Sequence, residues 1–249
     1  MITLASDFGT PYPAAMKGAI LRRSDARIVD VAHDFPRQDV RTAAFWLREV
    51  LPEFPPAVHC VVVDPGVGTD RAALVVRAGE SALVGPDNGV LLPAARELGD
   101  PEVFELAAAE PRSSTFHGRD VFAPAAADVH EAGVDALEEL TSLSPAGAHE
   151  DLRFPEADVD ADGAVGEVLV VDGFGNAITN VPGSFLDGRE RIAVNGDAVP
   201  VVASYAHVNT GTAIATVGSH GNVELAVNRG RGVDAFELGV GATVRLSAA

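Results

Sequence analysis

Apolar residues ahead of Ser142 fall into two kinds of stretch. Short continuous runs such as Val58–Val63 are rich in β-branched side chains and are typical of strands covered on both faces. Other stretches repeat apolar residues at helical spacing and predict amphipathic helices. The predicted strands are Met1–Ala5, Ala26–Val31, Val58–Val63, Ala72–Arg77 and Ser81–Val84, and the predicted helices are Ala14–Arg22, Val40–Leu51, Gly89–Glu97 and Val121–Gly133. Strands separated by helices predict an α/β domain with a mostly parallel sheet and helices on both faces.

The pattern changes near Leu143. Residues 146–164 are rich in Pro, Ala, Gly, Asp and Glu without strand or helical periodicity, which indicates a linker. Short β-rich segments divided by glycines follow, and their regular spacing predicts a small β-barrel. These segments are Gly166–Val171, Ala177–Asn180, Arg191–Val194, Val201–Ser204, Gly211–Val217, Asn222–Val227 and Ala242–Ser247. We therefore predict an N-terminal α/β domain at 1–145, a linker at 146–164 and a C-terminal β-barrel domain at 165–249.

The composition of the chain indicates which classes of partner to exclude and which habitat to expect. The net charge of −18 argues against nucleic acid and anionic membrane surfaces as partners. Lys17 is the only lysine, and an evenly acidic surface that avoids lysine suits a halophilic archaeon, whose salt screens charge repulsion. Cys60, the only cysteine, excludes an internal disulfide and suits a cytoplasmic location. No apolar run approaches the roughly 20 residues of a membrane-spanning helix, and the N-terminus lacks the basic region of a signal peptide.

Polar residues and glycines gather where predicted strands end, which is where ligands bind in open α/β sheets. Asp7 follows the first strand and could accept hydrogen bonds from a vicinal diol, or simply cap the next turn. Asp64 and Arg71 flank a tight loop and could form a rigid pair in a pocket or a structural ion pair. His117 lies ahead of a predicted helix, where it could orient a water molecule or belong to a surface cap.

Two glycine-containing segments of the β-rich part also carry polar groups. In Asp172–Asn176 the amide can pair with a purine edge, Phe174 can stack, and the carboxylate can pair with an ammonium group. The second segment runs from Gly218 to Asn228. Taken alone, both segments favour plain β-turns with an aromatic side chain in the core. The sequence has no zinc spacing of Cys and His, no phosphate-binding loop and no Gly-x-Ser-x-Gly elbow, so it predicts no metal site.

Taken together, these segments carry specific motifs in a specific order. The motifs are Ser-Asp-Phe-Gly-Thr, Met-Lys-Gly, Val-Asp-Pro-Gly-Val-Gly-Thr-x-Arg, Gly-Pro-Asp-Asn-Gly, Thr-Phe-His-Gly-Arg-Asp, Asp-x-Phe-Gly-Asn-x-x-Thr-Asn and Gly-Ser-x-Gly-x-x-Glu-x-Ala-x-Asn. From Ile2 to about Arg231 the chain resembles the S-adenosyl-L-methionine (SAM) hydroxide adenosyltransferases, which are related to the SAM-dependent fluorinase and chlorinase.

The resemblance implies a fold, an assembly and a reaction. The fold is an N-terminal α/β domain with a C-terminal β-barrel, and the assembly is a homotrimer with active sites between neighbouring subunits. In the implied reaction, water or hydroxide attacks C5′ of the SAM ribose and yields adenosine and methionine. The sulfonium leaves as a neutral thioether, so the reaction requires no general acid. It requires a positioned nucleophile in a site with little competing solvent. SAM is the substrate, and no cofactor is implied.

The resemblance also implies roles for the N-terminal residues. Asp64, Arg71 and His117 match the triad that positions and polarises the attacking water, and Asp7 matches the carboxylate that holds the ribose hydroxyls. In the halogenases, the loop that corresponds to the one beginning at Asp64 resembles Tyr-Pro-Ala-Thr-Gly. The halogenases also lack the histidine that corresponds to His117. A carboxylate facing the nucleophile repels a halide and accepts a hydrogen bond from water, which favours hydrolysis over halogenation.

The other substrate contacts implied by the resemblance fall in the C-terminal domain. Phe174 and Asn176 match adenine contacts, and Tyr205 looks like a second aromatic residue against the base. Asp172 matches the acid that pairs with the methionine ammonium group. The barrel motif supplies four more residues. Ser219 and His220 match the residues that hold the amino-acid end of methionine. Glu224 and Asn228 fall in the same motif without an assigned role.

Three alternatives to metal-free SAM hydrolysis stay open. A non-catalytic SAM- or adenosine-binding module would bind tightly without turnover, and a SAM-dependent halogenase would incorporate a halide. A metal-dependent hydrolase would lose its activity with a chelator. The sequence argues against the last because its His and Asp residues show no recognisable ligand spacing.

Overall fold

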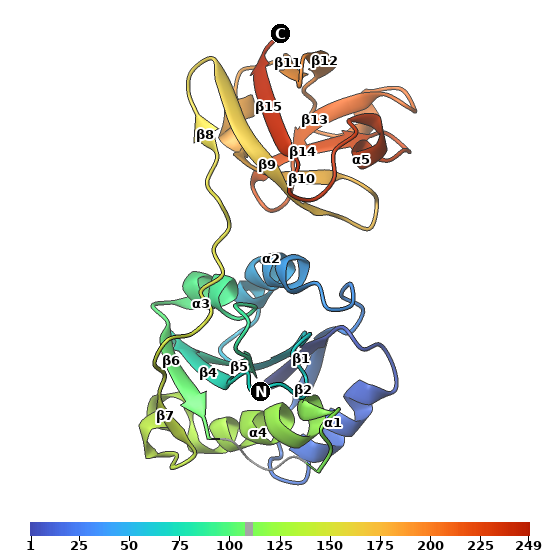
Figure 1. Cartoon of the computed structure of the whole chain (residues 1–249). Helices are drawn as coiled ribbons and strands as arrows, with labels where there is room; N and C mark the ends of the chain where they lie inside the picture. The colour runs from blue at the N-terminus through green and yellow to red at the C-terminus, as the bar shows by residue number, and fades with distance from the viewer. Residues whose placement is uncertain (108–111) are drawn as a thin grey trace. The chain divides into compact units, whose positions relative to one another are not determined.

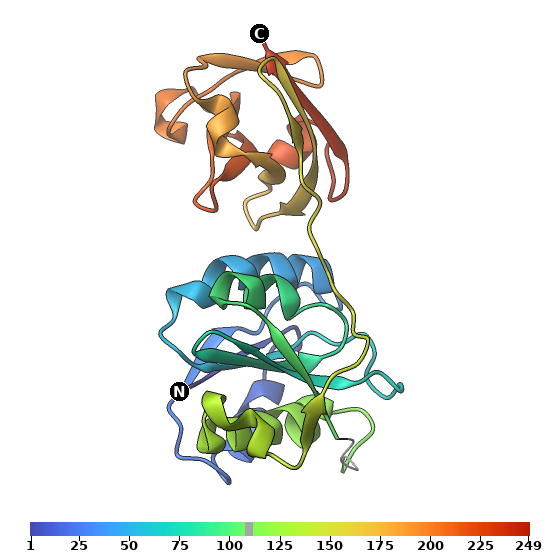
Figure 2. The same cartoon turned by 90° about the vertical axis from the view of Figure 1, so that its left-hand side faces the viewer.

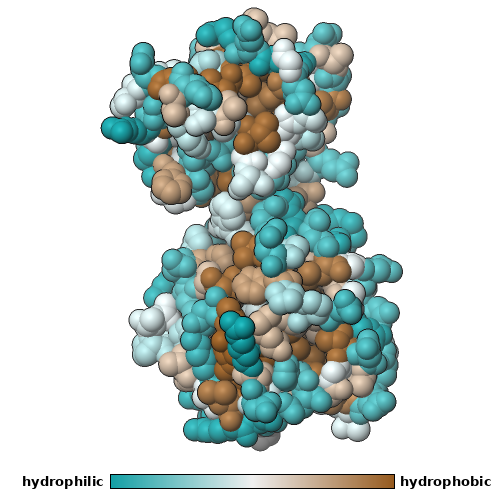
Figure 3. Space-filling model, turned by 180° about the vertical axis from the view of Figure 1, so that it is seen from behind, coloured by the Kyte–Doolittle hydropathy of each residue, from teal (hydrophilic) through white to brown (hydrophobic). Residues whose placement is uncertain are grey.

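The structure, a computed structural model, describes residues 1–107 and 112–249. It divides into two compact units, Met1–Arg153 and Phe154–Ala249 (Figure 1). On the face shown in Figure 3, hydrophilic side chains surround patches of apolar ones on both units. Among the described residues, no helix combines the length and the apolar composition that crossing a membrane takes.

The first unit is built around a seven-stranded sheet with the order β2-β1-β3-β5-β4-β6-β7. Its strands are β1 (Ile2–Ser6), β2 (Ile28–Ala32), β3 (Val58–Val62), β4 (Ala73–Ala78), β5 (Ser81–Pro86), β6 (Glu102–Leu106) and β7 (Leu143–Pro145). Strands β2, β1, β3 and β5 run parallel to one another, whereas β4, β6 and β7 pair in antiparallel fashion. The sheet is therefore mixed, and the expectation of a mostly parallel sheet holds for its first four strands only.

A short connection explains why β4 and β5 pair in antiparallel fashion. β4 and β5 are joined by Gly79 and Glu80 alone, and a two-residue turn can join only antiparallel strands. The turn needs Gly79 because its φ is +57°, a conformation that residues with a side chain rarely adopt. The apolar pattern does not predict β6 or β7, since only Phe104 of their residues is buried.

Helices cover both faces of this sheet (Figure 2). They are α1 (Tyr12–Ile20), α2 (Val40–Val50), α3 (Leu92–Leu98), α4 (Ala123–Ala132) and the short turns η1 (Leu51–Glu53), η2 (Gly118–Phe122) and η3 (Val134–Glu139). α2 packs with α3 on one face, and α1 packs with α4 on the other. Asp39 caps the start of α2, and its carboxylate accepts a hydrogen bond from the Thr42 N–H (2.9 Å). Between these layers every residue of β1, β3 and β5 is buried.

The second unit is an eight-stranded antiparallel sheet with the path β12-β11-β15-β9-β10-β14-β13, on which β8 pairs with β9. Its elements are β8 (Asp158–Val159), β9 (Gly163–Val171), β10 (Ala177–Pro182), η4 (Gly183–Leu186), β11 (Arg191–Val194), β12 (Asp197–Pro200), η5 (Tyr205–His207), β13 (Ala213–Val217), β14 (Asn222–Val227), α5 (Gly232–Ala235) and β15 (Thr243–Ala248). A bridge between Val201 and Ala215 joins the two ends of the path, so the sheet is a nearly closed barrel.

One strand of the barrel lies earlier in the chain than expected. β12 is Asp197–Pro200 rather than Val201–Ser204. It forms a hairpin with β11 across Asn195 and Gly196, which both have positive φ. Asn-Gly with two positive φ angles is the preferred two-residue hairpin turn, and this local signal locates the strand better than the apolar pattern does.

A buried histidine makes the first unit sensitive to acid. His59 lies in β3 with no solvent exposure, and its Nδ1 is 2.8 Å from Thr3 Oγ1. Burial lowers the pKa of His59 to about 4. Since the unfolded chain takes up this proton near pH 6.5 and the folded chain only near pH 4, the stability of the folded state falls as the pH drops through that window.

We expect the unfolding free energy of the first unit to fall by about 2 kcal/mol between pH 7 and pH 5 through His59 alone. Denaturant unfolding followed by the fluorescence of Trp46, the only tryptophan, measures this loss in the same unit. His59→Gln keeps a polar partner for Thr3 but does not titrate, so its loss over the same interval should be smaller by that amount. Equal losses in the two proteins would contradict the assignment to His59.

Candidate active site

Three of the predicted site residues form one array in the first unit. Asp64 follows β3, Arg71 precedes β4 and His117 precedes η2. Arg71 Nε donates to Asp64 Oδ1 (2.8 Å), and Arg71 Nη2 pairs with the other oxygen, Oδ2, so the two charges meet in a bidentate fork. The same Nη2 lies 3.3 Å from His117 Nδ1. The fold therefore brings the three side chains together, although Arg71 and His117 are 46 residues apart in the sequence.

The pair is held tightly and almost out of water. Only 1% of the Asp64 side chain is exposed, and its Oδ1 also accepts the Gly66 N–H (3.0 Å). The Arg71 guanidinium lies over the Phe122 ring, 5.0 Å from its centre, and donates to the Ala72 carbonyl (2.9 Å). A buried ion pair is stable only when such bonds satisfy both partners. The array is therefore held together by its own contacts before any ligand binds.

The contact with Arg71 fixes how His117 presents its ring. Arginine has only N–H donors and stays charged, so His117 Nδ1 must accept at this contact. In the neutral ring the proton is then on Nε2, which can donate a hydrogen bond to a polar atom. A carboxylate acceptor and an imidazole donor in one array can hold a water molecule from both sides. Within 1–107 and 112–249, no group of three or more His, Cys, Asp or Glu side chains could hold a metal ion.

Asp7 lies at the same edge of the sheet as Asp64. β1 and β3 are parallel neighbours, with Ser6 opposite Val62, so both carboxylates follow the carboxyl ends of adjacent strands. Asp7 Oδ2 accepts a hydrogen bond from the Gln38 N–H (2.7 Å), which ties the carboxylate to the connection after β2.

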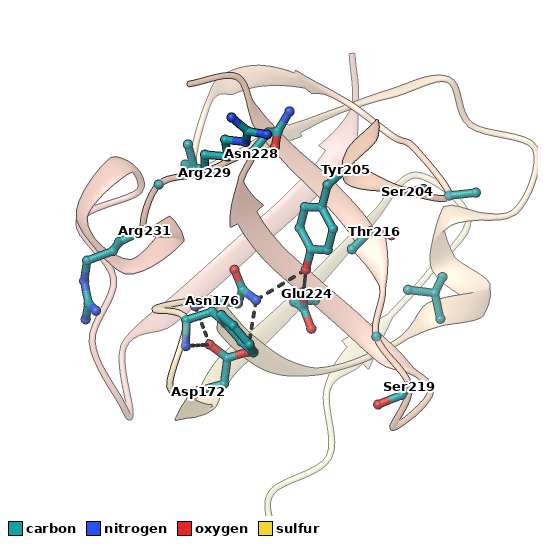
Figure 4. A pocket seen from close by; sticks show the side chains of 16 residues that line it. Asp172, Asn176, Ser204, Tyr205, Thr216, Ser219, Glu224, Asn228, Arg229 and Arg231 are labelled. Atoms are coloured by element: carbon teal, nitrogen blue, oxygen red, sulfur yellow. Dashed lines mark hydrogen bonds between the residues drawn. The ribbon is translucent and has the colours of Figure 1, made fainter. Parts of the chain in front are cut away.

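A pocket of about 910 Å³ in the second unit gathers most of the predicted substrate residues (Figure 4). The predicted residues that line it are Asp172, Phe174, Asn176, Tyr205, Ser219, Glu224 and Asn228. They come from the β9–β10 turn, from η5 and from the β13–β14 hairpin and its exit. The barrel thus joins segments that are widely separated in the sequence around one cavity large enough for a small molecule.

A line of hydrogen bonds crosses the pocket wall. Asn176 Nδ2 donates to Asp172 Oδ2 (3.0 Å) and to the Tyr205 hydroxyl (3.3 Å), which in turn donates to Glu224 Oε1. Burial and the Glu224 carboxylate raise the pKa of Tyr205 well above its usual range. Burial acts to raise the pKa of Glu224, but hydrogen bonds from His220 and Tyr205 outweigh it and keep that pKa below its usual value. Tyr205 therefore stays a neutral donor to an ionised carboxylate.

His220 does not line this pocket, unlike the other predicted residues of the barrel. Only 3% of its side chain is exposed, and its Nε2 lies 3.6 Å from Glu224 Oε2. Its Nδ1 accepts the Asn222 N–H (3.2 Å), so the proton of the neutral ring lies on Nε2 and faces the carboxylate. His220 supports Glu224 from behind the wall in this structure.

Sequence reasoning missed four polar residues of the pocket. Ser204, Thr216, Arg229 and Arg231 also line it. Arg231 pairs with Asp234 (3.3 Å), and its stem packs against Gly175, which has no side chain in the way. Guanidinium groups suit a carboxylate ligand, and two arginines next to a predicted site in a chain of net charge −18 were a usable signal.

Comparisons with known proteins agree along the whole chain. The family model for the SAM hydroxide adenosyltransferase N-terminal domain matches residues 2–141, and the model for the C-terminal domain of the same name matches residues 166–245. The chain is 38% identical to a protein of Salinispora tropica (99% of this chain, 97% of the relative) and 42% identical to one of Thermus thermophilus (97% of each). Both relatives are named (R)-S-adenosyl-L-methionine hydrolase.

Solved structures show the same fold. An uncharacterized conserved protein from Thermotoga maritima superposes with a TM-score of 0.84 at 33% identity, covering 99% of this chain and 100% of that one. A conserved hypothetical protein from Thermus thermophilus gives a TM-score of 0.75 at 40% identity, with 98% of each chain covered.

We expect Tyr205→Phe to destabilise the second unit by about 1–3 kcal/mol, because the buried Glu224 carboxylate loses the hydroxyl that donates to it. Calorimetric unfolding of this unit measures the effect, and the Trp46 fluorescence transition of the first unit should not change. Tyr12→Phe at the only other tyrosine is the control, since that side chain is 53% exposed and its loss should cost less than about 0.5 kcal/mol. Equal effects of the two changes would rule out the hydroxyl bond as a stabilising contact.

Proposed function

We propose that this chain, which belongs to the SAM hydroxide adenosyltransferase family, hydrolyses S-adenosyl-L-methionine to adenosine and L-methionine. The observation that carries the proposal is the preorganised array of Asp64, Arg71 and His117, found in a chain that matches named SAM hydrolases over its full length. The array offers an acceptor and a donor for a water molecule without a bound metal.

The reaction makes modest demands on the protein. The water oxygen forms a bond to C5′ of the ribose while the C5′–S bond breaks, and its electron pair goes to the sulfur. The sulfonium leaves as the neutral thioether of methionine, and the water releases one proton to the solvent as its oxygen becomes the 5′-hydroxyl of adenosine. Because no charge builds up on the leaving group, the rate depends on holding the nucleophile in line and excluding other water.

Each member of the array has its own part in the proposal. Asp64 accepts a hydrogen bond from the attacking water and its negative charge disfavours a halide at the same place. His117 donates to the water oxygen through Nε2. Arg71 contacts both partners and keeps them in register, so it acts through Asp64 and His117. An N-terminal carboxylate, Asp7, holds the ribose hydroxyls.

The pocket of the second unit is proposed to take the rest of the substrate. Phe174 and Tyr205 pack against adenine with Asn176 at its edge, and Asp172 pairs with the methionine ammonium group. Ser219 belongs to the methionine end. The remaining predicted residues have no assigned substrate contact. His220 supports Glu224, and Asn228 lies in the pocket wall.

Assembly and location are part of the same proposal. We expect a homotrimer with active sites between neighbouring subunits, and the 81% exposure of Phe174 at the pocket supports a covering partner. A cytoplasm of high salt fits the net charge of −18 and the single cysteine, Cys60, which is buried.

Incubation of the purified protein with SAM should yield adenosine and methionine in equal amounts, with or without a chelator. In oxygen-18 water the label should appear in the adenosine hydroxyl, since water attacks carbon. Added chloride should give no chlorinated nucleoside. Tight binding of SAM without products would instead support a non-catalytic module, and loss of turnover with the chelator would support metal-dependent hydrolysis.

His117→Ala should lower kcat by about a hundredfold or more, because the attacking water loses a positioned partner. Binding of the product adenosine, measured by calorimetry, should stay within about twofold, since His117 is assigned to the water and not to the nucleoside. His149→Ala, at another histidine of the first unit, is the matched control and should keep full activity. A fully active His117→Ala protein would remove this residue from the mechanism.

A further inference from the structure

A chain of hydrogen bonds that the proposed reaction does not use lies at the edge of the sheet that carries Asp7. Ser6 Oγ is 2.7 Å from His33 Nδ1, and His33 Nε2 is 3.0 Å from Asp30 Oδ1. The other oxygen of Asp30 accepts from Lys17 Nζ (2.6 Å). Ser6 ends β1, Asp30 lies in β2 with His33 just after it, and Lys17 belongs to α1.

This Ser–His–Asp order is not built for nucleophilic attack. Ser6 is fully buried at the end of β1, and its hydroxyl is bonded to His33. The ring is also reversed, because hydrolase triads place Nε2 toward the serine and Nδ1 toward the carboxylate. In this chain Nδ1 faces Ser6 and Nε2 faces Asp30. The chain of bonds is therefore a structural one.

The direction of the bonds follows from Asp30. Burial acts to raise the pKa of Asp30, but the contacts with Lys17 and His33 outweigh it and lower that pKa. The ionised carboxylate is an acceptor only, so His33 Nε2 carries a proton and donates. In the neutral ring Nδ1 then accepts the Ser6 hydroxyl. Both ring nitrogens are occupied, and the imidazole has one orientation.

His33 contacts the chain on both sides of Asp7. Its ring holds the Ser6 side chain, and its carbonyl accepts the Gly9 N–H (2.8 Å). The Asp7 carboxylate itself accepts the N–H of Gln38, which lies in the same connection after β2. The position of Asp7 is thus set by the β2–α2 connection, which His33 ties to the end of β1.

We propose that His33 is a positioning residue that sets the Asp7 carboxylate for the ribose hydroxyls of a bound nucleoside. The inference rests on the proposed function in so far as Asp7 binds the ribose of SAM. A carboxylate that moves by about 1 Å loses much of its grip, so His33 affects recognition of the hydroxyls without touching the ligand.

The test measures discrimination between adenosine and 2′-deoxyadenosine by calorimetry on the full chain. The wild-type protein should bind adenosine on the order of tenfold more tightly, since the extra hydroxyl bonds to a charged acceptor. His33→Phe keeps a ring but removes both ring bonds, and this ratio should fall toward one. His33→Asn restores an acceptor near Ser6 and should keep an intermediate ratio.

A second Ser–His pair in the same unit supplies the matched control. His130 Nδ1 lies 3.2 Å from Ser24 Oγ, and its Nε2 lies 2.9 Å from the amine of Met1, which immediately precedes β1 and so marks the amino end of that strand. His130→Phe should therefore leave the ratio at its wild-type value. If His33→Phe does not fold, as judged by circular dichroism, Ser6→Ala replaces it and should lower the ratio in the same direction.

A folded His33→Phe or Ser6→Ala protein with the wild-type ratio would overturn the inference, as would a wild-type protein that does not distinguish the two nucleosides. Turnover gives an independent arm, in which kcat/KM for SAM should fall more than kcat/KM for its 2′-deoxy analogue. An inactive wild-type protein would overturn the proposed function alone, because nucleoside binding needs no turnover and still decides the role of His33.

Discussion

The bidentate contact between Asp64 and Arg71 is the interaction on which the rest of the candidate site depends. Two charges that are nearly buried are tolerated only when hydrogen bonds satisfy both, and here Gly66, Ala72 and the ring of Phe122 complete the set. The guanidinium is held by contacts on several sides, and it dictates which nitrogen of His117 accepts and which donates. The chemistry assigned to water therefore follows from the geometry of one ion pair.

The parallel half of the sheet explains why polar groups gather beside that pair. Strands β2, β1 and β3 run parallel, so the residues that follow them emerge at one edge. Asp7, His33 and Asp64 are those residues, and hydrogen bonds tie the first two together through Ser6 and Gly9. Every residue of β1 and β3 is buried, which gives this edge a rigid base. The antiparallel strands β4, β6 and β7 extend the sheet away from it.

In the barrel, several polar side chains lie around one cavity and pair with one another. Asn176, Tyr205 and Glu224 form one line of bonds, and His220 contacts its end from behind. Such a line is stable only when all its members are satisfied. Its members then have few alternative conformations, while Phe174 stays 81% exposed at the cavity. A rigid polar wall beside an exposed aromatic ring is a suitable surface for a flat heterocycle with polar edges.

The sequence by itself determined the two-part α/β and β-barrel architecture, most helices and strands, and the motifs that identify the family, because these features depend on local periodicity and short spacings. It also contained the Asn195-Gly196 hairpin signal. The two-residue connection between β4 and β5 already required these strands to be antiparallel, whereas tertiary structure alone decided that β6 and β7 join the sheet and that His220 lies behind the pocket wall. It alone joined His33 to Ser6, 27 residues apart, and Arg71 to His117, 46 residues apart. Contacts between such distant positions arise from how strands are ordered in a sheet, and no local pattern encodes that order.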